Sequence, residues 1–349
     1  MDILITAFGE FNGKAVNRYT LTNSKGNSVC IINYGATVIS WKIQDRDNKV
    51  RNIVTGFDDL GSYLQNDVYM GCIAGRYANR IGKGKFAIHG KAYQLGCNNG
   101  NNHLHGGAAG FDKVFWEATI IEGNIPTLSL AYHSKDGEEG YPGNLDVVVT
   151  YSYTNNDELI INYHANTDAA TVINLTSHGY FNLTGDVQQN ILGHTLQINA
   201  AYFTAVNEEQ VPTGELTAVE ETAFDFNTPK KIARDLSGTV NGYDHNYVLN
   251  SGDHELAQAA VLTDPANELQ LQVYTTEPGI QLYTGNLLNG SLVNRDGKAI
   301  AMHTALCLET QHFPDSPNHP DFPSTILEPG ETFVSQTMYR IVVNGAAVQ

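Results

Sequence analysis

The chain has 349 residues, with 20 Lys or Arg and 37 Asp or Glu, which gives a formal net charge of −17 at pH 7. A field of this sign repels nucleic acid and anionic membrane surfaces, so we expect neither as a partner, whereas a neutral small molecule is compatible with it. The sequence is long enough to bury a large core and contains no linker, charge block or repeat, so we expect residues 1–349 to form a single domain.

The N-terminal segment and the cysteines indicate a reducing compartment. Residues 1–9 lack the basic region and long apolar run of a signal peptide, and no stretch of the sequence is apolar enough to span a bilayer. The cysteines form no close-spaced pair and lie far apart, at Cys30, Cys72, Cys97 and Cys307. Such thiols in a chain of this size are expected to be reduced. We therefore predict a cytoplasmic protein.

Helix and turn signals in the first half of the chain are few and short. Residues 62–65 predict a helix of about one turn. Gly82–Gly84 and Asp136-Gly137 predict tight hairpin turns, because glycine adopts the left-handed conformations that these turns need. A chain with such punctuation is expected to run mainly in strands.

A period of two dominates the second half. Residues 145–153, 159–164 and 268–274 each predict a strand, because apolar or β-branched residues alternate with polar ones or crowd the segment. Thr228-Pro229 before residues 230–236 predicts a short helix with proline in its first turn. Many strands, few short helices and 33 glycines predict an all-β fold, a large antiparallel β-sandwich whose concave sheet face lines a ligand site.

Two segments between residues 75 and 107 carry candidate functional groups. Arg80, in residues 75–81, presents several fixed donors that suit a polyhydroxylated ligand or a buried acid, although most arginines lie at the surface and Arg76 is interpreted as structural. His103 and His105 have the spacing of a metal-binding pair on a strand, but the glycines that follow indicate a loop. Hydrogen-bonding histidines are therefore preferred here, and no metal is predicted.

Three further residues remain ambiguous when they are considered one by one. His178, followed by Gly179 and aromatic residues, is either a hydrogen-bonded core histidine or a proton donor and acceptor near neutral pH. Asp244 is of the type that caps a turn. Gln281 lies before a strand-like stretch, where a structural hydrogen bond is the simpler interpretation.

Glu309 is an acid at the end of an apolar run. Residues 305–308 are apolar on both faces of a predicted strand, and Glu309 follows them, after which the polar and proline-rich residues 310–323 predict a loop. A carboxylate carried inward is costly unless hydrogen bonds, a charge or a ligand compensates it. Such acids are over-represented at functional sites, although structural ion pairs also occur. We place Glu309 at the inner mouth of a loop-lined cleft.

Taken in order, these segments resemble the aldose 1-epimerase (galactose mutarotase) family over essentially the full length. The resemblance is carried by seven segments: GRYANRI (75–81), LHGG (104–107), FDK (111–113), NLTSHGYFNL (174–183), GYDHN (242–246), EPGIQLYTGN (277–286) and LETQHFPDSPNHPDFP (308–323). It implies a large β-sandwich of the galactose mutarotase type, a supersandwich. It also implies interconversion of the α and β anomers of a free aldohexose such as galactose or glucose, without a cofactor.

The same resemblance implies a role for each site residue. Glu309 would be the general base and His178 the general acid, and the residues that bind sugar hydroxyls would be Asn79, Arg80, His105, Asp244 and Gln281. The partner would be a small-molecule sugar, and the protein a monomer or a homodimer. The alternatives are a non-catalytic sugar-binding module, a metal-dependent enzyme, a hexose 6-phosphate epimerase and a glycoside hydrolase, the last of which normally needs two carboxylates.

Overall fold

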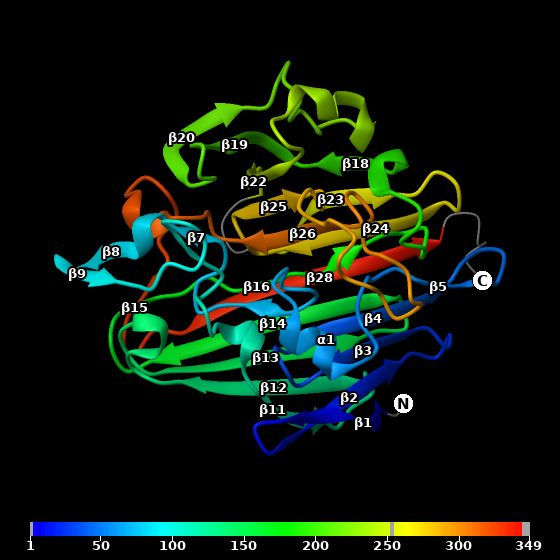
Figure 1. Ribbon diagram of the computed structural model, residues 1–349, viewed down its shortest axis with the longest axis horizontal. Coiled ribbons are helices and arrows are strands. Elements are labelled where there is room, and N and C mark those ends of the chain that lie inside the picture. Colours follow the sequence, from blue (N-terminus) through cyan, green and yellow to red (C-terminus); the bar gives the residue numbers. More distant parts are fainter. Residues whose placement is uncertain (1–2, 252–254, 344–349) are drawn as a thin grey trace.

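Two large antiparallel sheets form the body of the protein (Figure 1). The computed structural model describes residues 3–251 and 255–343. The nine-stranded sheet contains, in spatial order, β11 (Glu117–Ile121), β12 (Thr127–Ser134), β13 (Leu145–Tyr153), β14 (Glu158–Thr167), β28 (Phe333–Val343), β24 (Leu269–Thr275), β23 (Ala257–Thr263), β18 (Thr195–Ile198) and β21 (Lys230–Lys231). The six-stranded sheet contains β17 (Tyr180–Phe181), β26 (Leu306–Gln311), β25 (Gly279–Tyr283), β22 (Asp244–Leu249), β19 (Ala200–Val206) and β20 (Pro212–Ala218).

Smaller sheets and short helices complete the fold. A five-stranded meander consists of β1 (Ile3–Phe11), β2 (Lys14–Thr22), β3 (Ser28–Ile32), β4 (Thr37–Gln44) and β5 (Val50–Asn52). Two-stranded pairs join β6 (Ile73–Ala74) to β16 (Thr176–Ser177), β7 (Arg80–Ile81) to β10 (His103–Leu104), β8 (Lys85–Ile88) to β9 (Lys91–Gln94) and β15 (Thr171–Val172) to β27 (Ile326–Leu327). The helices are α1 (Leu60–Gln65) and the 3-10 turns Gly82–Gly84, Phe111–Lys113, Glu138–Gly140, Ile191–Gly193, Ile232–Gly238 and Ser316–Asn318.

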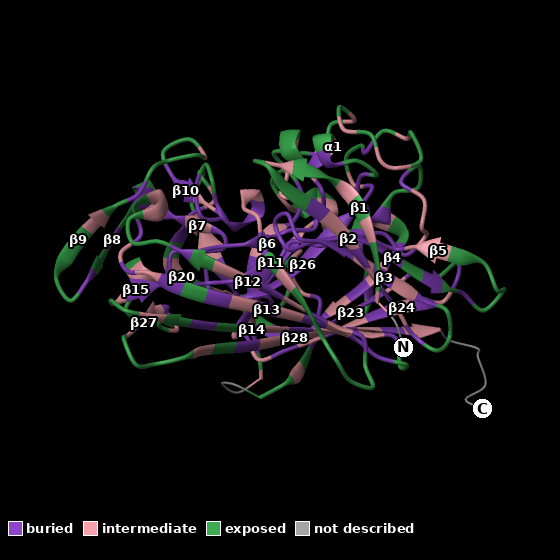
Figure 2. Ribbon diagram, turned by 90° about the horizontal axis from the view of Figure 1, so that it is seen from below, coloured by how far each residue is buried: buried purple, intermediate pink, exposed green. Residues whose placement is uncertain are grey.

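The core lies between the nine-stranded sheet on one side and the six-stranded sheet and the meander on the other, and buried residues run through the centres of the strands (Figure 2). Strand β13 has the predicted bounds, and its alternate residues from Leu145 to Tyr153 are buried. Tyrosine hydroxyls on this inner face find carbonyl partners across the core: Tyr151 donates to the Ala36 oxygen at 2.7 Å, and Tyr339 to that of Leu308 at 2.9 Å. Buried hydroxyls need such acceptors, and these tie the sheets together.

Strand prediction succeeded where the alternation is strong. The predicted strands 159–164 and 268–274 lie within or overlap β14 and β24. The predicted helix 62–65 is part of α1, which starts earlier because the Asp59 carboxylate caps the Ser62 N–H at 2.9 Å. Residues 230–236 form less helix than predicted, because Lys230 and Lys231 pair with β18 before the 3-10 turn begins.

One of the two predicted hairpin turns is wrong, and the other lies in a hairpin connection that is longer than a tight turn. Gly82–Gly84 joins β7 to β8, which pair with β10 and β9 respectively and not with each other. Asp136 and Gly137 lie in a connection between the paired strands β12 and β13, but that connection spans residues 135–144 and includes a 3-10 turn. Gly137 does take a left-handed conformation, with φ of 81°. Glycines in the sequence indicate where the chain changes direction. Which strands then pair with each other depends on tertiary packing.

Among the described residues, no helix is long and apolar enough to cross a membrane. All four cysteines lie within the described residues and are free thiols, as predicted.

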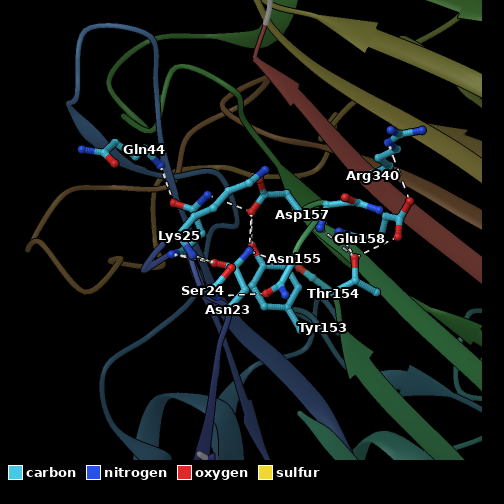
Figure 3. Close-up of polar contacts among 12 residues, drawn as sticks. Asn23, Ser24, Lys25, Gln44, Tyr153, Thr154, Asn155, Asp157, Glu158 and Arg340 are labelled. Carbon is cyan, nitrogen blue, oxygen red and sulfur yellow. Dashed lines mark hydrogen bonds and ion pairs between the residues drawn. The ribbon is translucent and has the colours of Figure 1, made fainter. Parts of the chain in front are cut away.

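A buried carboxylate clamps the meander to the nine-stranded sheet (Figure 3). Asp157, 3% exposed, lies in the turn between β13 and β14. Its Oδ1 accepts hydrogen bonds from Asn23 at 2.7 Å, from Asn27 at 2.8 Å and from the Tyr153 hydroxyl at 3.0 Å. Its Oδ2 lies 2.8 Å from the Lys25 ammonium. Four donors converge on one acid, so its loss leaves buried amides and a hydroxyl without an acceptor.

We predict that Asp157→Ala lowers the free energy of unfolding by about 3 kcal/mol, because several buried donors lose their acceptor. Asp157 also has a left-handed φ of 59°, which alanine tolerates poorly. Asp157→Asn tolerates the same backbone conformation and keeps one acceptor oxygen. Its free energy of unfolding should lie between those of the parent protein and of Asp157→Ala. The control is Asp146→Ala, which removes a 75% exposed side chain paired with His133. Urea unfolding followed by circular dichroism measures all three; equal effects at positions 157 and 146 would contradict the clamp.

Candidate active site

A pocket of about 150 Å³ opens beside the six-stranded sheet and contains every residue that the sequence proposed for the site. Its predicted members are Asn79, Arg80, His105, His178, Asp244, Gln281 and Glu309. The remaining lining residues are Asp67, Val68, Tyr69, Asn99, Leu104, Tyr180, Tyr283 and Leu287. Residues 230 positions apart in the sequence therefore meet in one small cavity.

Three adjacent strands carry the acid and amide side chains. Glu309 on β26 lies opposite Gln281 on β25, and Gln281 lies opposite Asn246 on β22. Asp244 is two residues from Asn246 and so shares its face of the sheet. The Gln281 amide donates to Asp244 Oδ1 at 2.6 Å. Asp244 and Gln281 are thus strand residues, rather than the turn cap and pre-strand residue that local patterns suggested.

Strand β26 extends two residues beyond the predicted end at Glu309. Thr310 and Gln311 are polar, but both are buried and hydrogen-bonded across strands. The Thr310 hydroxyl meets that of Thr337 at 2.5 Å, and the Gln311 amide donates to Asn246 Oδ1 at 3.4 Å. Polar residues can continue a buried strand when neighbouring strands supply partners, which the sequence alone does not reveal.

Glu309 is 2% exposed, and no described residue donates a hydrogen bond to its Oε2. Burial raises the pKa of this carboxyl well above its ordinary value; the charge of Asp244 raises the pKa further, and Arg80 lowers it. The His178 imidazole lies beside the carboxylate, with Nε2 3.6 Å from Oε2. An inward carboxylate without a full set of donors is poised to interact with a proton or a ligand.

His178 lies between β16 and β17, and two tyrosine rings stack on it. The Tyr180 ring stacks on it at 5.1 Å and 25°, and the Tyr69 ring at 6.0 Å and 27°. Its Nδ1 lies 3.5 Å from the Cys307 sulfur. Burial lowers the pKa of His178 to about 4. The imidazole is therefore fixed in plane, with one nitrogen toward Cys307 and the other toward Glu309.

The hydrogen bonds of His105 decide which form of its ring faces the pocket. The backbone N–H of Asn79 donates to His105 Nδ1 at 3.1 Å. Because Nδ1 is then an acceptor, the proton of the neutral ring is on Nε2. Burial lowers the pKa of His105, which favours this neutral form. His105 thus offers a hydrogen-bond donor to a ligand.

This tautomer weighs against a metal ion. The ligand atoms of His105, His178 and Glu309 lie within 4.8 Å of one another, a spacing that could hold one. A metal on His105 Nε2, however, needs a lone pair at the nitrogen that carries the proton. His103 does not join this group, because its Nδ1 contacts the Gly96 carbonyl at 2.6 Å and its Nε2 the Tyr141 hydroxyl at 2.7 Å. The pairing of His103 with His105 as metal ligands is therefore not supported.

The two arginines of the segment 75–81 have different surroundings. Arg76 is buried and structural, as interpreted from the sequence: its guanidinium donates to the Ser134 hydroxyl at 2.6 Å and the Gly143 carbonyl at 3.0 Å. Arg80 lines the pocket, and its Nε donates to Asn99 Oδ1 at 3.1 Å. The Asn79 side-chain oxygen accepts a hydrogen bond from the Arg80 N–H at 2.8 Å.

Sequence reasoning missed several lining residues. Tyr69 packs against both His105, at 4.5 Å, and His178, yet it sits outside every recognised motif. Its left-handed φ of 56° turns the chain into the pocket, and no local pattern predicts that conformation for a tyrosine. Tyr180 belongs to the aromatic wall expected beside His178, and it lines the pocket. Tyr283 lies in the recognised segment 277–286, two residues from Gln281 on β25, and that spacing could have indicated it. Asn99 lies outside every recognised segment.

A larger cavity, of about 550 Å³, lies elsewhere, near β27 and the start of β28. Its buried acid, Glu277, already pairs with His312 at 2.6 Å. The smaller pocket is the better candidate, because there a buried acid and an imidazole face open space.

Comparison with known proteins agrees with this geometry. The family model described as aldose 1-epimerase matches residues 17–340. The chain belongs to the aldose 1-epimerase family. It is 43% identical over 316 residues to a galactose mutarotase of Bos taurus, covering 90% of this chain and 91% of that protein. It is 42% identical over 339 residues to a galactose mutarotase of Homo sapiens, covering 96% and 97% respectively.

Solved structures confirm the predicted fold of this family member. A GalM/aldose epimerase homologue from C. elegans superposes with a TM-score of 0.87 at 26% identity, covering 94% of this chain and 99% of that one. The all-β sandwich of the galactose mutarotase type, with few short helices, is therefore the correct fold class.

We predict that His178 is neutral in the ligand-free protein at pH 6. Burial lowers its pKa from 6.5 to about 4, so the ring binds a proton only well below the pH at which an exposed histidine does. Long-range ¹H–¹⁵N spectra recorded from pH 4 to pH 8 report the charge of each ring, and His178→Asn assigns the signal. A doubly protonated His178 ring at pH 6 would show that desolvation does not govern this group.

Proposed function

We propose that the protein is an aldose 1-epimerase that interconverts the α and β anomers of free aldohexoses such as galactose and glucose. The observation that carries the proposal is the pairing of Glu309 with His178 at 3.6 Å inside a pocket lined by hydrogen-bonding side chains. The related proteins named galactose mutarotase support it. We also propose one domain over residues 1–349, action in the cytoplasm as a monomer or homodimer, and no cofactor.

Ring opening needs one base and one acid. His178 is neutral in the ligand-free protein, so it first takes up a proton when the sugar binds. The Glu309 carboxylate then accepts the proton of the anomeric hydroxyl, and the His178 imidazolium donates its Nε2 proton to the ring oxygen as the bond between that oxygen and carbon-1 breaks. Rotation about the carbon-1 to carbon-2 bond then presents the other face of the aldehyde. Reclosure returns both protons to their donors. Positioned groups of this kind contribute about 10²- to 10⁴-fold each.

The burial of the pair favours the ring-opened state. Before ring opening the pair is charged, with a carboxylate and an imidazolium, and afterwards it is a carboxylic acid and a neutral imidazole. Desolvation raises the pKa of Glu309 and lowers that of His178, so it stabilises the second state relative to the first. The site thus offsets part of the cost of forming the open-chain aldehyde.

The other lining residues have the chemistry of a polyol site. Arg80 and the Nε2–H of His105 are donors, Asp244 is an acceptor, and Gln281 is both. Gln281 Oε1 is buried, and no described residue donates to it, so it is available to a sugar hydroxyl. We assign Asn79, Arg80, His105, Asp244 and Gln281 to substrate binding.

The alternatives fit the pocket less well. A hexose 6-phosphate needs a cationic cradle, but among the described lining residues the acids Asp67, Asp244 and Glu309 face a single guanidinium, that of Arg80. A binding module without catalysis has no need of an acid and an imidazole facing each other in a desolvated pocket.

We predict that Glu309→Gln lowers the rate of mutarotation about 10²- to 10⁴-fold, because the amide retains the shape of the side chain but cannot accept the proton. Polarimetry on freshly dissolved α-galactose measures the rate, and the thermal midpoint reports folding. Glu268→Gln changes an acid that is 46% exposed and serves as the control. Near-normal turnover of the Glu309 variant would refute the assignment.

We predict that His178→Asn reduces kcat more than it weakens sugar binding, because the imidazole acts on the ring oxygen during the reaction. Binding of galactose by calorimetry and kcat by polarimetry separate the two effects. Equal losses in both would show that His178 only holds the substrate. The same assay with pure anomers of galactose, glucose and other aldoses ranks the substrates.

A further inference from the structure

One strand contacts both nitrogens of the same imidazole. Cys307 and Glu309 are two residues apart on β26 and therefore share a face. The Cys307 sulfur lies 3.5 Å from His178 Nδ1, and Glu309 Oε2 lies 3.6 Å from His178 Nε2. Tyr69 and Tyr180 stack on the same ring, and Cys307 and Glu309 each lie near one of its nitrogens.

The Cys307 group is a neutral thiol. It is fully buried, and burial raises the pKa of the thiol well above its ordinary value, with the nearby charges of Glu309 and Asp244 raising it further. A neutral thiol is both a weak donor and a weak acceptor. Two arrangements are therefore available: either the sulfur accepts from Nδ1–H, or the S–H donates to a bare Nδ1.

Proton transfer distinguishes these arrangements. When Nδ1 carries a proton, Nε2 can lose its own proton to the ring oxygen and recover it later, and the ring alternates between imidazolium and neutral imidazole. When Nδ1 is bare, the neutral ring carries its proton on Nε2, and loss of that proton would leave an imidazolate. The first arrangement leaves the Nδ1–H bond intact through the whole cycle.

We propose that Cys307 is a positioning residue whose sulfur accepts the Nδ1 proton of His178, so that Nε2 is the atom that transfers protons. This inference rests on the proposed epimerase function and deepens it. Cys307 does not touch the substrate and acts only through His178, as partners of catalytic histidines do in general when they set the tautomer. Backbone contacts support the geometry: the His178 N–H donates to the Cys72 carbonyl at 2.8 Å.

The test compares two buried cysteines. Cys307→Ala removes the acceptor, and we expect kcat to fall about 5- to 10-fold, as for the loss of one hydrogen bond, with KM changed less than about twofold. Cys307→Ser restores an acceptor and should return kcat to within about twofold. Cys72→Ala removes another buried thiol, for which no side-chain hydrogen bond to His178 is found among the described residues, and it keeps the Cys72 carbonyl that accepts the His178 N–H. The value of kcat should stay within about twofold of the parent.

A second readout does not depend on activity. In ¹⁵N-labelled protein above pH 6, the neutral His178 ring should carry its proton on Nδ1, and Cys307→Ala should shift the population toward the Nε2–H form, whereas Cys72→Ala should not. An unchanged tautomer and kcat in Cys307→Ala would overturn the proposal, as would an equal loss of kcat in Cys72→Ala. If the parent protein shows no mutarotation, the proposed function fails, while the tautomer shift still decides whether Cys307 orients the ring.

Discussion

The site depends on one physical constraint, the burial of a carboxylate that the protein itself does not fully satisfy. Glu309 is carried into the interior by a strand, and no described residue donates to its Oε2. Its neighbours are an imidazole at 3.6 Å, an acid that raises its pKa and a guanidinium that lowers it. A ligand hydroxyl can donate the hydrogen bond that this oxygen lacks. Binding of the ligand therefore offsets part of the free-energy cost of burying the carboxylate.

The sandwich makes this arrangement rigid. Successive side chains of β26 point to opposite faces of the sheet, so one face packs against the nine-stranded sheet while the other faces the site. Thr310 contacts Thr337 of the nine-stranded sheet, and the Leu308 carbonyl accepts the Tyr339 hydroxyl. Cys307 and Glu309, on the other face, contact His178. Packing of the two sheets therefore fixes the position of the acid relative to the imidazole, which loops alone would hold less firmly.

Sequence patterns predicted strands most reliably where every second residue of the strand is buried. The bounds of β13 match the prediction because Leu145 to Tyr153 alternate cleanly, and the inward position of Glu309 followed from the apolar run before it. The hairpin predicted at Gly82–Gly84 is wrong, because a glycine-rich turn contains no information about which strands pair on either side of it. The prediction also ended β26 at Glu309, because the partners that satisfy Thr310 and Gln311 come from other strands.

By itself, the sequence determined the family, the all-β class and the seven proposed site residues, because ordered motifs and period-two alternation are local properties of the chain. Only the tertiary structure decided that these seven side chains line one pocket, that Tyr69 and Tyr180 stack on His178, and that Asn79 sets the tautomer of His105. Those facts depend on contacts between segments far apart in the chain. Burial, ring orientation and the choice of protonated nitrogen are properties of such contacts and have no local signature.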